Sequence, residues 1–311
     1  MARPIIIDTD PGQDDAVAIL LALASPELEV LGLTCVAGNV PLALTTLNAR
    51  KVVDLARRPV PVFAGAAGPL GRTLVTAEHV HGRTGLDGPD LPDPVTSLDP
   101  RDGIAWMIET LRQTDGVTLC PLGPLTNIAT ALTRAPDIAP RIHEVVLMGG
   151  GYFEQGNITP SAEFNIYVDP VAADIVVRSG VPVTFLPLDV THRALTTRPR
   201  VEAFRALGPV GRTVAELTDF FERFDKEKYG SAGAPLHDPC VIAYLLAPEM
   251  FKGRRVAVTI DTRDGPTLGA TLVDYWRVTK AAPNATWVRN LDADAFFALL
   301  TDRLARLEQG A

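Results

Sequence analysis

Short apolar runs alternate with longer stretches of helical periodicity along most of the chain. The runs are apolar on both faces and predict strands at 4–8, 29–36, 60–63, 117–121, 144–148 and 182–186. The stretches between them predict helices at 14–24, 41–57, 101–114, 124–134 and 170–179. Strands of this kind, separated by helices, indicate an α/β fold with an open, Rossmann-like, largely parallel (mixed) sheet that carries helices on both faces.

Residues typical of helix boundaries agree with these helices. The alternation of strands and helices changes near residue 200. Pro41 fits a helix start, Asp99 precedes the next helix, and Gly180 fits a helix stop. The later elements are predicted as helices at 199–207, 210–228, 239–246 and 292–307, and as strand-like runs at 254–260 and 267–279. Residues 64–100 show no clear element, and long loops of this kind are often functional. We interpret residues 1–311 as a single domain.

Composition narrows the class of protein. A net charge of −8 without any Lys/Arg block argues against nucleic-acid binding. No segment approaches the roughly 20 apolar residues of a membrane span, and the N-terminus does not resemble a signal peptide. The three cysteines, Cys35, Cys120 and Cys240, have no metal-binding spacing and are interpreted as reduced core residues. We therefore expect a cytoplasmic protein.

Tryptophans in apolar patterns are more often core residues than ligand contacts. Trp106, Trp276 and Trp287 all lie in such patterns, so we expect each of them to pack in the core.

Polar residues follow the predicted strands at the point where each strand ends. The carboxyl ends of parallel strands form one rim of the sheet, where ligands bind in open α/β folds. These strand-end residues are Asp8, Asp10, Asn39, Thr126, Asn157, Glu163, Asn165, Asp189 and His192. We therefore expect a single site on that rim.

The first of these clusters, in "IIIDTDPGQDDAVAILLAL", gathers four carboxylates, Asp8, Asp10, Asp14 and Asp15. Carboxylates this close repel one another unless a divalent cation neutralises them, and hard oxygen ligands select Ca²⁺ or Mg²⁺. No His/Cys ligand set accompanies them, which argues against zinc. The alternative is that Asp14 and Asp15 only favour a helix N-terminus through its dipole. Asp238, in "LHDPC", offers one more carboxylate at a helix start.

The motifs "DTDPGQDDAVAILLAL", "GNV", "GPLTNIA", "VVLMGGG", "AEFNIYVDP" and "HDPC" occur in one order along the chain. Together they resemble the inosine-uridine preferring nucleoside hydrolase family. The resemblance implies an open α/β fold, one Ca²⁺ in the active site, and cleavage of ribonucleosides to free base and ribose. It also implies a homodimer or homotetramer.

Residue by residue, the resemblance implies a calcium site made by Asp10, Asp15, Asp238 and the backbone carbonyl of Thr126. Asp10 would also be the general base that activates a calcium-bound water. Asp8 belongs to the same motif and is given only a supporting role.

The resemblance also implies a substrate site. The residues expected to bind the ribose are Asp14, Asn39, Asp238 and Asn165 on the 2′ and 3′ hydroxyls, Asn157 and Glu163 at the 5′ end, and Met148 beneath the sugar. His237 occupies the position associated with protonation of the leaving base. His81 matches a histidine near the base pocket.

The region of the base pocket departs from the pattern of some relatives. Only "GSAGAPL" separates Tyr229 from His237, where several purine-accepting relatives carry a longer segment with an Arg-Tyr pair. No tryptophan lies near residues 81–85, where purine-specific relatives stack the base. The resemblance therefore leaves the preferred base open.

Two other functions fit parts of the sequence. A phosphatase of the haloacid dehalogenase type also opens with DxD after a strand, but the hydroxyl and Lys motifs of that class are not evident here. A nucleoside or ribose sensor without catalytic activity would need to have lost a base or a metal ligand, and Asp10, Asp15 and Asp238 are all present.

Overall fold

The computed structural model describes residues 2–229 and 233–309, without the side chains of 224–229. Eleven strands are present in these ranges. In chain order they are β1 (Arg3–Thr9), β2 (Leu28–Cys35), β3 (Val62–Ala64), β4 (Leu98–Asp102), β5 (Val117–Pro121), β6 (Ile142–Met148), β7 (Val183–Leu186), β8 (Phe251–Val256), β9 (Val258–Ile260), β10 (Thr271–Val273) and β11 (Ala285–Leu291).

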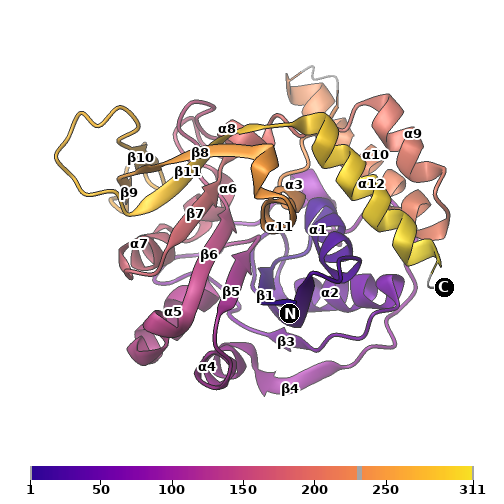
Figure 1. The fold of residues 1–311 in the computed structure, drawn as a ribbon, viewed down its shortest axis with the longest axis horizontal. Coiled ribbons are helices and arrows are strands. Elements are labelled where there is room, and N and C mark those ends of the chain that lie inside the picture. The colour runs from indigo at the N-terminus through magenta and orange to yellow at the C-terminus, as the bar shows by residue number, and fades with distance from the viewer. Residues whose placement is uncertain (1, 230–232, 310–311) are drawn as a thin grey trace.

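Nine of these strands form one sheet in the order β4-β3-β2-β1-β5-β6-β7-β11-β8 (Figure 1). Every pairing in this sheet is parallel except that of β11 with the edge strand β8. Strands β9 and β10 form a separate antiparallel ribbon. The predicted open, largely parallel and mixed α/β sheet is therefore confirmed.

Helices connect the strands and cover the sheet. The helices are α1 (Gln13–Leu23), α2 (Leu42–Ala56), α3 (Glu78–His81), α4 (Gly103–Gln113), α5 (Thr126–Arg134), α6 (Phe164–Val168), α7 (Pro170–Arg178), α8 (Leu188–Thr191), α9 (Arg198–Arg205), α10 (Pro209–Tyr229), α11 (Pro239–Leu246) and α12 (Ala293–Gln309), with 3₁₀ turns at Pro136–Arg141 and Pro248–Met250. Within the described residues, no helix is both long and apolar enough to cross a membrane.

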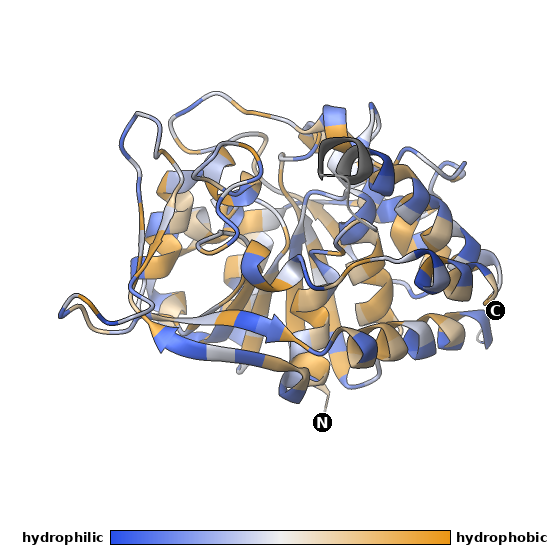
Figure 2. Cartoon of the chain, turned by 90° about the horizontal axis from the view of Figure 1, so that it is seen from above, coloured by the Kyte–Doolittle hydropathy of each residue, from blue (hydrophilic) through white to orange (hydrophobic). Residues whose placement is uncertain are grey.

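The central strand β1 shows why both faces of the sheet are covered. Ile5 and Ile7 pack into a core with α1, α2, α11 and α12, whereas Ile6 packs into a second core with α4, α5 and α7. Side chains alternate between the faces of a strand, so a strand that is apolar at every position needs a layer of helices on each side. Figure 2 shows the hydrophobic residues gathered in these central elements and the hydrophilic ones toward the outside.

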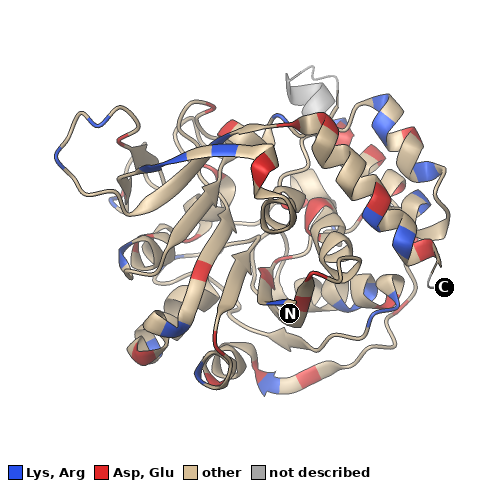
Figure 3. Ribbon diagram, in the orientation of Figure 1, with Lys and Arg blue, Asp and Glu red and all other residues tan. Residues whose placement is uncertain are grey.

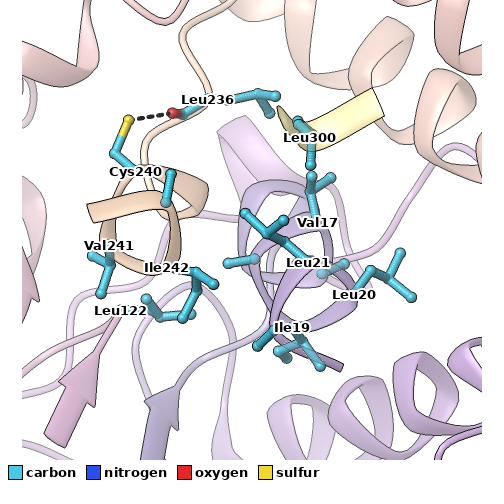
Figure 4. Close-up of a cluster of buried hydrophobic side chains, with 14 of the residues drawn as sticks. Val17, Ile19, Leu20, Leu21, Leu122, Leu236, Cys240, Val241, Ile242 and Leu300 are labelled. Carbon is cyan, nitrogen blue, oxygen red and sulfur yellow. Dashed lines mark hydrogen bonds between the residues drawn. The ribbon is translucent and has the colours of Figure 1, made fainter. Parts of the chain in front are cut away.

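The core on the α1 side joins two helices that are far apart in the sequence. Val17 and Leu21 of α1 and Val241 and Ile242 of α11 belong to one buried cluster, in which Ile242 lies on the side of α11 that faces α1 (Figure 4). Cys240 of α11 also belongs to it, and its thiol donates a hydrogen bond to the Leu236 carbonyl. Packing of these apolar faces fixes the distance between the N-terminal ends of α1 and α11.

Several boundary predictions are confirmed. Pro41 precedes α2, and Gly180 follows the end of α7 with a φ of +84°, a left-handed conformation that glycine adopts without strain. The three cysteines are buried free thiols. Trp106 and Trp287 are also buried, as predicted.

Other predictions are wrong. The run 254–260 divides between β8 and β9, which belong to different sheets, and 267–279 contains only the short strand β10. Strands β4 ("LDPRD") and β11 ("ATWVRNL") were missed because polar and charged residues interrupt their apolar runs. The residue that caps α4 is Asp102, which accepts a hydrogen bond from the Ala105 amide, and Asp99 lies inside β4.

Trp276 is not a core residue. It lies in the loop after β10, and 64% of its surface is exposed. Its ring contacts Tyr275 and the Arg254 guanidinium on the outside of the molecule. The apolar pattern around it reflects a surface cluster of rings and arginines.

Candidate active site

The predicted site residues converge at the carboxyl ends of the central parallel strands. One pocket there is lined by ten of them: Asp14, Asn39, His81, Met148, Asn157, Glu163, Asn165, His192, His237 and Asp238. Asp10, Asp15 and Thr126 do not line this pocket, and each is at most 1% exposed. The pocket therefore has a buried acidic layer next to it, and Figure 3 shows the acidic start of α1 near the centre of the molecule.

Three carboxylates approach one another at the ends of two helices. Oxygens of Asp14, Asp15 and Asp238 lie within 4.8 Å of one another, and all three side chains are buried. Asp14 and Asp15 occupy the first turn of α1, and Asp238 is the residue before α11. Because α1 and α11 pack together, the fold brings these three acids into one group.

Burial and mutual repulsion raise the pKa values of these acids. Burial and then repulsion from Asp15 raise the pKa of Asp14 to about 8. Burial and then repulsion from Asp14 and Asp15 raise the pKa of Asp238 well above its ordinary value. Anions in this position need a compensating positive charge, and a divalent cation supplies one.

Asp15 is held by the turn that starts α1. Its Oδ1 accepts a hydrogen bond from the Thr9 hydroxyl at 2.6 Å, and its Oδ2 accepts one from the Gly12 amide at 2.9 Å. The Asn39 amide nitrogen donates to the same Oδ2 at 3.3 Å. These bonds fix the carboxylate and link the strand end, the helix start and the loop after β2.

Asp10 lies in a cradle formed by two glycines. A Cβ atom on Gly38 would lie 2.0 Å from its Oδ2, and one on Gly123 would lie 2.1 Å from its Oδ1. Oδ2 accepts the Asn39 backbone amide at 2.7 Å, whereas the buried Oδ1 has no hydrogen-bond partner among the described residues. A buried carboxylate oxygen without a partner fits a site for a cation or for a water that Asp10 would bind.

Thr126 begins α5, and hydrogen bonds hold both its side chain and its backbone carbonyl. Its hydroxyl donates to Asp169 at 2.7 Å, and its carbonyl accepts the Thr130 hydroxyl at 2.7 Å. Asp8 points elsewhere: its Oδ2 accepts bonds from Thr34 and Asn127, which tie β1 to β2 and α5.

Two asparagines in the pocket wall have their amide nitrogens fixed by the protein. Asn39 Nδ2 donates to the Asp10 carbonyl at 3.2 Å, besides its bond to Asp15. Asn165 Nδ2 donates to the Leu122 carbonyl at 2.6 Å and to the Met148 carbonyl at 3.2 Å. The oxygen of each side-chain amide therefore remains as an acceptor, which suits the hydroxyl groups of a sugar.

Glu163 and Asn157 are joined to the start of α6. Glu163 accepts the amides of Asn165 at 3.0 Å and Gly150 at 3.0 Å, and Asn157 Oδ1 accepts the Phe164 amide at 2.9 Å. Burial raises the pKa of Glu163 to about 7. This end of the pocket therefore holds a carboxyl group that changes charge near neutral pH.

Four rings form one wall of the pocket, which we call the ring wall: His81, Phe221, His237 and His192. His81 stacks on Phe221 with centroids 5.5 Å apart, Phe221 meets His237 edge-on at 6.3 Å, and His237 lies 5.7 Å from His192. Flat, contiguous rings suit the faces and edges of a heterocyclic base.

The state of His237 is set by burial and by one hydroxyl. Its Nδ1 lies 2.7 Å from the Thr191 hydroxyl. Burial, with the nearby His192 and His81, lowers the pKa of His237 well below its ordinary value. His192 lies 3.5 Å from Glu154, and its pKa is also lowered by burial, against an opposing effect of Glu154.

Sequence reasoning missed several residues that shape this site. Gly38 and Gly123 stood inside quoted motifs, and their position directly after strands was the available signal. Phe221 belongs to the long amphipathic α10, so nothing in its local pattern separated it from a core residue. Tyr229, the residue before the shortened segment, has its side chain outside the described residues.

Comparison with known proteins bears on the identity of this site. The family profile described as "Inosine-uridine preferring nucleoside hydrolase" matches residues 5–298. The chain belongs to this family. It is a nucleoside hydrolase, which confirms the predicted family and excludes the phosphatase alternative.

Individual relatives are similar to this chain over nearly its whole length. A protein from Salmonella agona named pyrimidine-specific ribonucleoside hydrolase RihA is 49% identical over 310 residues, covering 98% of this chain and 99% of the relative. A solved purine-preferring ribonucleoside hydrolase from Gardnerella vaginalis is 32% identical with a TM-score of 0.92, covering 99% of this chain and 100% of that one. A solved plant nucleoside hydrolase is 30% identical with a TM-score of 0.89, covering 98% and 99%.

Proposed function

We propose that this protein hydrolyses the N-glycosidic bond of ribonucleosides in a calcium-dependent reaction in which Asp10 activates the attacking water. The observation that carries the proposal is the buried Oδ1 of Asp10, which has no partner among the described residues, beside the acidic group Asp14, Asp15 and Asp238. A sensor that only binds ribose would not require a buried, unpartnered carboxylate next to three further acids.

The residues proposed to hold Ca²⁺ are Asp10, Asp15, Asp238 and the Thr126 carbonyl. All four donors are oxygen atoms, and the hardness of this set favours Ca²⁺ over a transition metal. When bound, the ion would neutralise the carboxylates and polarise a water molecule. The N-terminal ends of α1 and α11 add partial positive charge to the same place, which further favours the anionic carboxylates.

Asp10 is proposed as the general base because of how its two oxygens are used. Oδ2 is occupied by the Asn39 amide, which fixes the carboxylate, and Oδ1 is left to accept a proton from water. Because Gly38 and Gly123 carry no Cβ atom, the two carboxylate oxygens fit closely beside their backbones.

The ribose would bind through Asp14, Asn39, Asp238 and Asn165 on its 2′ and 3′ hydroxyls, with Met148 beneath the ring. The free side-chain oxygens of Asn39 and Asn165 support this assignment, as does the burial of all four polar side chains. Glu163 and Asn157 are proposed for the 5′ end. Cleavage passes through an oxocarbenium-like sugar, so groups that grip the hydroxyls contribute most when they bind that state more tightly than the substrate.

His237 is proposed to protonate the departing base. A proton given to the base leaves a neutral ring only if His237 is the imidazolium, in which both ring nitrogens carry a proton. Nδ1–H would then donate to the Thr191 hydroxyl, and Nε2–H, on the nitrogen that does not face Thr191, would protonate the base. Burial lowers the pKa of His237 and so opposes this charged form in the free protein.

Pyrimidine ribonucleosides are the proposed preferred substrates. The support is the 49% identity with relatives named pyrimidine-specific, against 32% with the purine-preferring hydrolase. The absence of an aromatic residue at 82–85 is also consistent with a smaller base.

The experiment that tests the proposal is release of reducing sugar from uridine, cytidine, inosine and adenosine, before and after exhaustive chelation. We expect activity to be lost on chelation and restored by Ca²⁺, with kcat/KM highest for uridine or cytidine. Full activity without any retained metal would contradict the metal assignment, and measurable binding without sugar release would favour a sensor.

A further inference from the structure

Gln13 is the one polar residue of the N-terminal acidic motif to which no role has been given so far. It is the first residue of α1, is 1% exposed, and is neither a carboxylate nor a pocket-lining residue. All its side-chain bonds go to a segment about seventy residues away, the loop around α3. A buried amide with such partners restricts the groups that it touches.

The orientation of the Gln13 amide follows from its two nitrogen bonds. Nε2 donates to the His81 carbonyl at 2.9 Å and to the Asp87 carbonyl at 3.0 Å. Carbonyl oxygens only accept, so both amide hydrogens are used there, and a flipped amide would place oxygen against two carbonyls. Oε1 must therefore face the third partner, His81 Nδ1, at 2.7 Å.

This orientation determines the tautomer of His81. An amide oxygen has no proton to give, so Nδ1 of His81 must carry the proton of that hydrogen bond. Burial, with a contribution from His79, lowers the pKa of His81 to about 3, so the ring is neutral at physiological pH. A neutral ring with its proton on Nδ1 has a lone pair on Nε2.

The side of the ring that faces the pocket follows from Gly12. A Cβ atom on Gly12 would lie 2.4 Å from His81 Nδ1 and 2.7 Å from Cε1, so this edge of the ring packs against the α1 turn. His81 nevertheless lines the pocket and stacks on Phe221. Its Nε2 is the ring nitrogen left for that side.

We propose that Gln13 is a positioning residue that holds His81 in the Nδ1–H tautomer, so that Nε2 of His81 accepts a hydrogen bond from an N–H group of the nucleobase. The second half of this proposal rests on the proposed function, whereas the first half concerns the free protein alone. His81 then accepts a hydrogen bond from the base and does not protonate it. A base with a ring N–H or amino group, such as uracil or cytosine, satisfies this acceptor.

The tautomer is tested directly by ¹⁵N NMR of histidine-labelled protein, with the His81 signals assigned by their loss in His81→Gln. The chain has five histidines, so the spectrum is simple. We expect a pyrrole-type Nδ1 and a pyridine-type Nε2 in the wild type. Gln13→Met should turn both signals into a tautomer mixture, because the methionine side chain offers no strong acceptor to Nδ1. Gln113→Met, at the exposed C-terminal end of α4, is the control and should change nothing.

A pyridine-type Nδ1 in the wild type would overturn the proposal, even if Gln13→Met did not fold. An unchanged His81 spectrum in folded Gln13→Met would also overturn it, because Gln13 would then not hold the tautomer.

The contact with the base is tested by comparing uridine with 3-methyluridine, in which the ring N–H is replaced. The wild type should prefer uridine by about tenfold or more in kcat/KM, since the methyl group removes the donor to Nε2 and leaves a buried acceptor unpaired. In Gln13→Met this preference should shrink, and kcat/KM for p-nitrophenyl riboside should fall less than that for uridine. The same ratio of kcat/KM for uridine and 3-methyluridine in the wild type and in Gln13→Met would overturn the base contact. Absence of activity on every nucleoside would instead contradict the proposed function, and the NMR result would still decide the tautomer.

Discussion

At one end of the pocket, Asp14, Asp15 and Asp238 stand at the N-terminal ends of two helices that pack against each other through a buried core. The ring wall adjoins this group, since His237 precedes Asp238 and His81 packs against Gly12, and it is assembled from α3, α10 and the segments after α8 and before α11. The first of these parts, the acidic end, is held by the packed helices α1 and α11. The second depends on short elements and on single contacts such as those of Gln13 and Thr191.

This difference separates the chemistry shared by all substrates from the chemistry that distinguishes them. A sugar and a cation are the same for every ribonucleoside, so a rigid end built on strand ends and helix starts suits them. Bases differ in size and in hydrogen-bonding groups, and a wall of rings on separate segments is easier to vary than a strand end. We therefore expect mutations at the acidic end to affect all substrates and mutations at the ring wall to affect them unequally.

The largest effect should come from removing one hydroxyl of the substrate. A 2′-deoxynucleoside would leave Asp14, Asn39 and the proposed metal with unpaired buried groups, which reduces kcat/KM by as much as about 10⁴-fold. Paired kinetics on uridine and deoxyuridine measure this ratio, with cytidine and deoxycytidine as a second pair. Similar turnover of both members of a pair would contradict the ribose assignment.

Asp10→Asn tests the acidic end itself. The amide keeps an oxygen for the Asn39 backbone N–H and fits between Gly38 and Gly123, so the fold should be preserved. It cannot accept a proton from water, and kcat should fall at least about 10³-fold on every substrate, including p-nitrophenyl riboside. Asp294→Asn, on an exposed position of α12, is the control. Loss of a general base lowers activity by far more than tenfold. Activity within tenfold of the wild type would therefore show that another group is the base.

His237→Ala tests the ring wall and should discriminate between substrates. Nucleosides need a proton on the leaving base, so kcat should fall by about 10²-fold or more. Nitrophenolate leaves without a proton, so p-nitrophenyl riboside should retain most of its turnover. An equal loss on both substrates would mean that His237 supports the neighbouring Asp238 rather than protonating the base.

The sequence predicted which residues meet at the rim of the sheet better than it predicted how they are held there. Asp10, Asn39 and Asn165 all come after predicted strands, and the carboxyl ends of parallel strands meet at that rim. Phe221 and Gln13 act through contacts between segments distant in sequence, which no local pattern records. The strands that were missed, β4 and β11, carry charged residues within the strand, and β11 is held in the sheet by pairing on both sides.

Ile242→Ala should separate stability from chemistry at the acidic end. Ile242 is fully buried in the cluster that joins α11 to α1, so the truncation should lower the free energy of unfolding by about 2–5 kcal/mol. Urea denaturation of the protein measures this change. Leu272→Ala, at a position on β10 that is 50% exposed, should change stability far less. Comparable losses in the two variants would mean that the α1–α11 contact is not a major part of the core.

The smallest effect is expected for Phe221→Leu, which keeps an apolar side chain but removes the ring between His81 and His237. An aromatic pair contributes about 0.5–1.5 kcal/mol beyond its buried area, so KM for nucleosides should rise by no more than roughly tenfold. Because Phe221 holds no proton and no metal, kcat should change little, and p-nitrophenyl riboside should respond differently from uridine. A uniform loss of kcat on all substrates would show that the ring also orders the acidic end, and the separation between the acidic end and the ring wall would then fail.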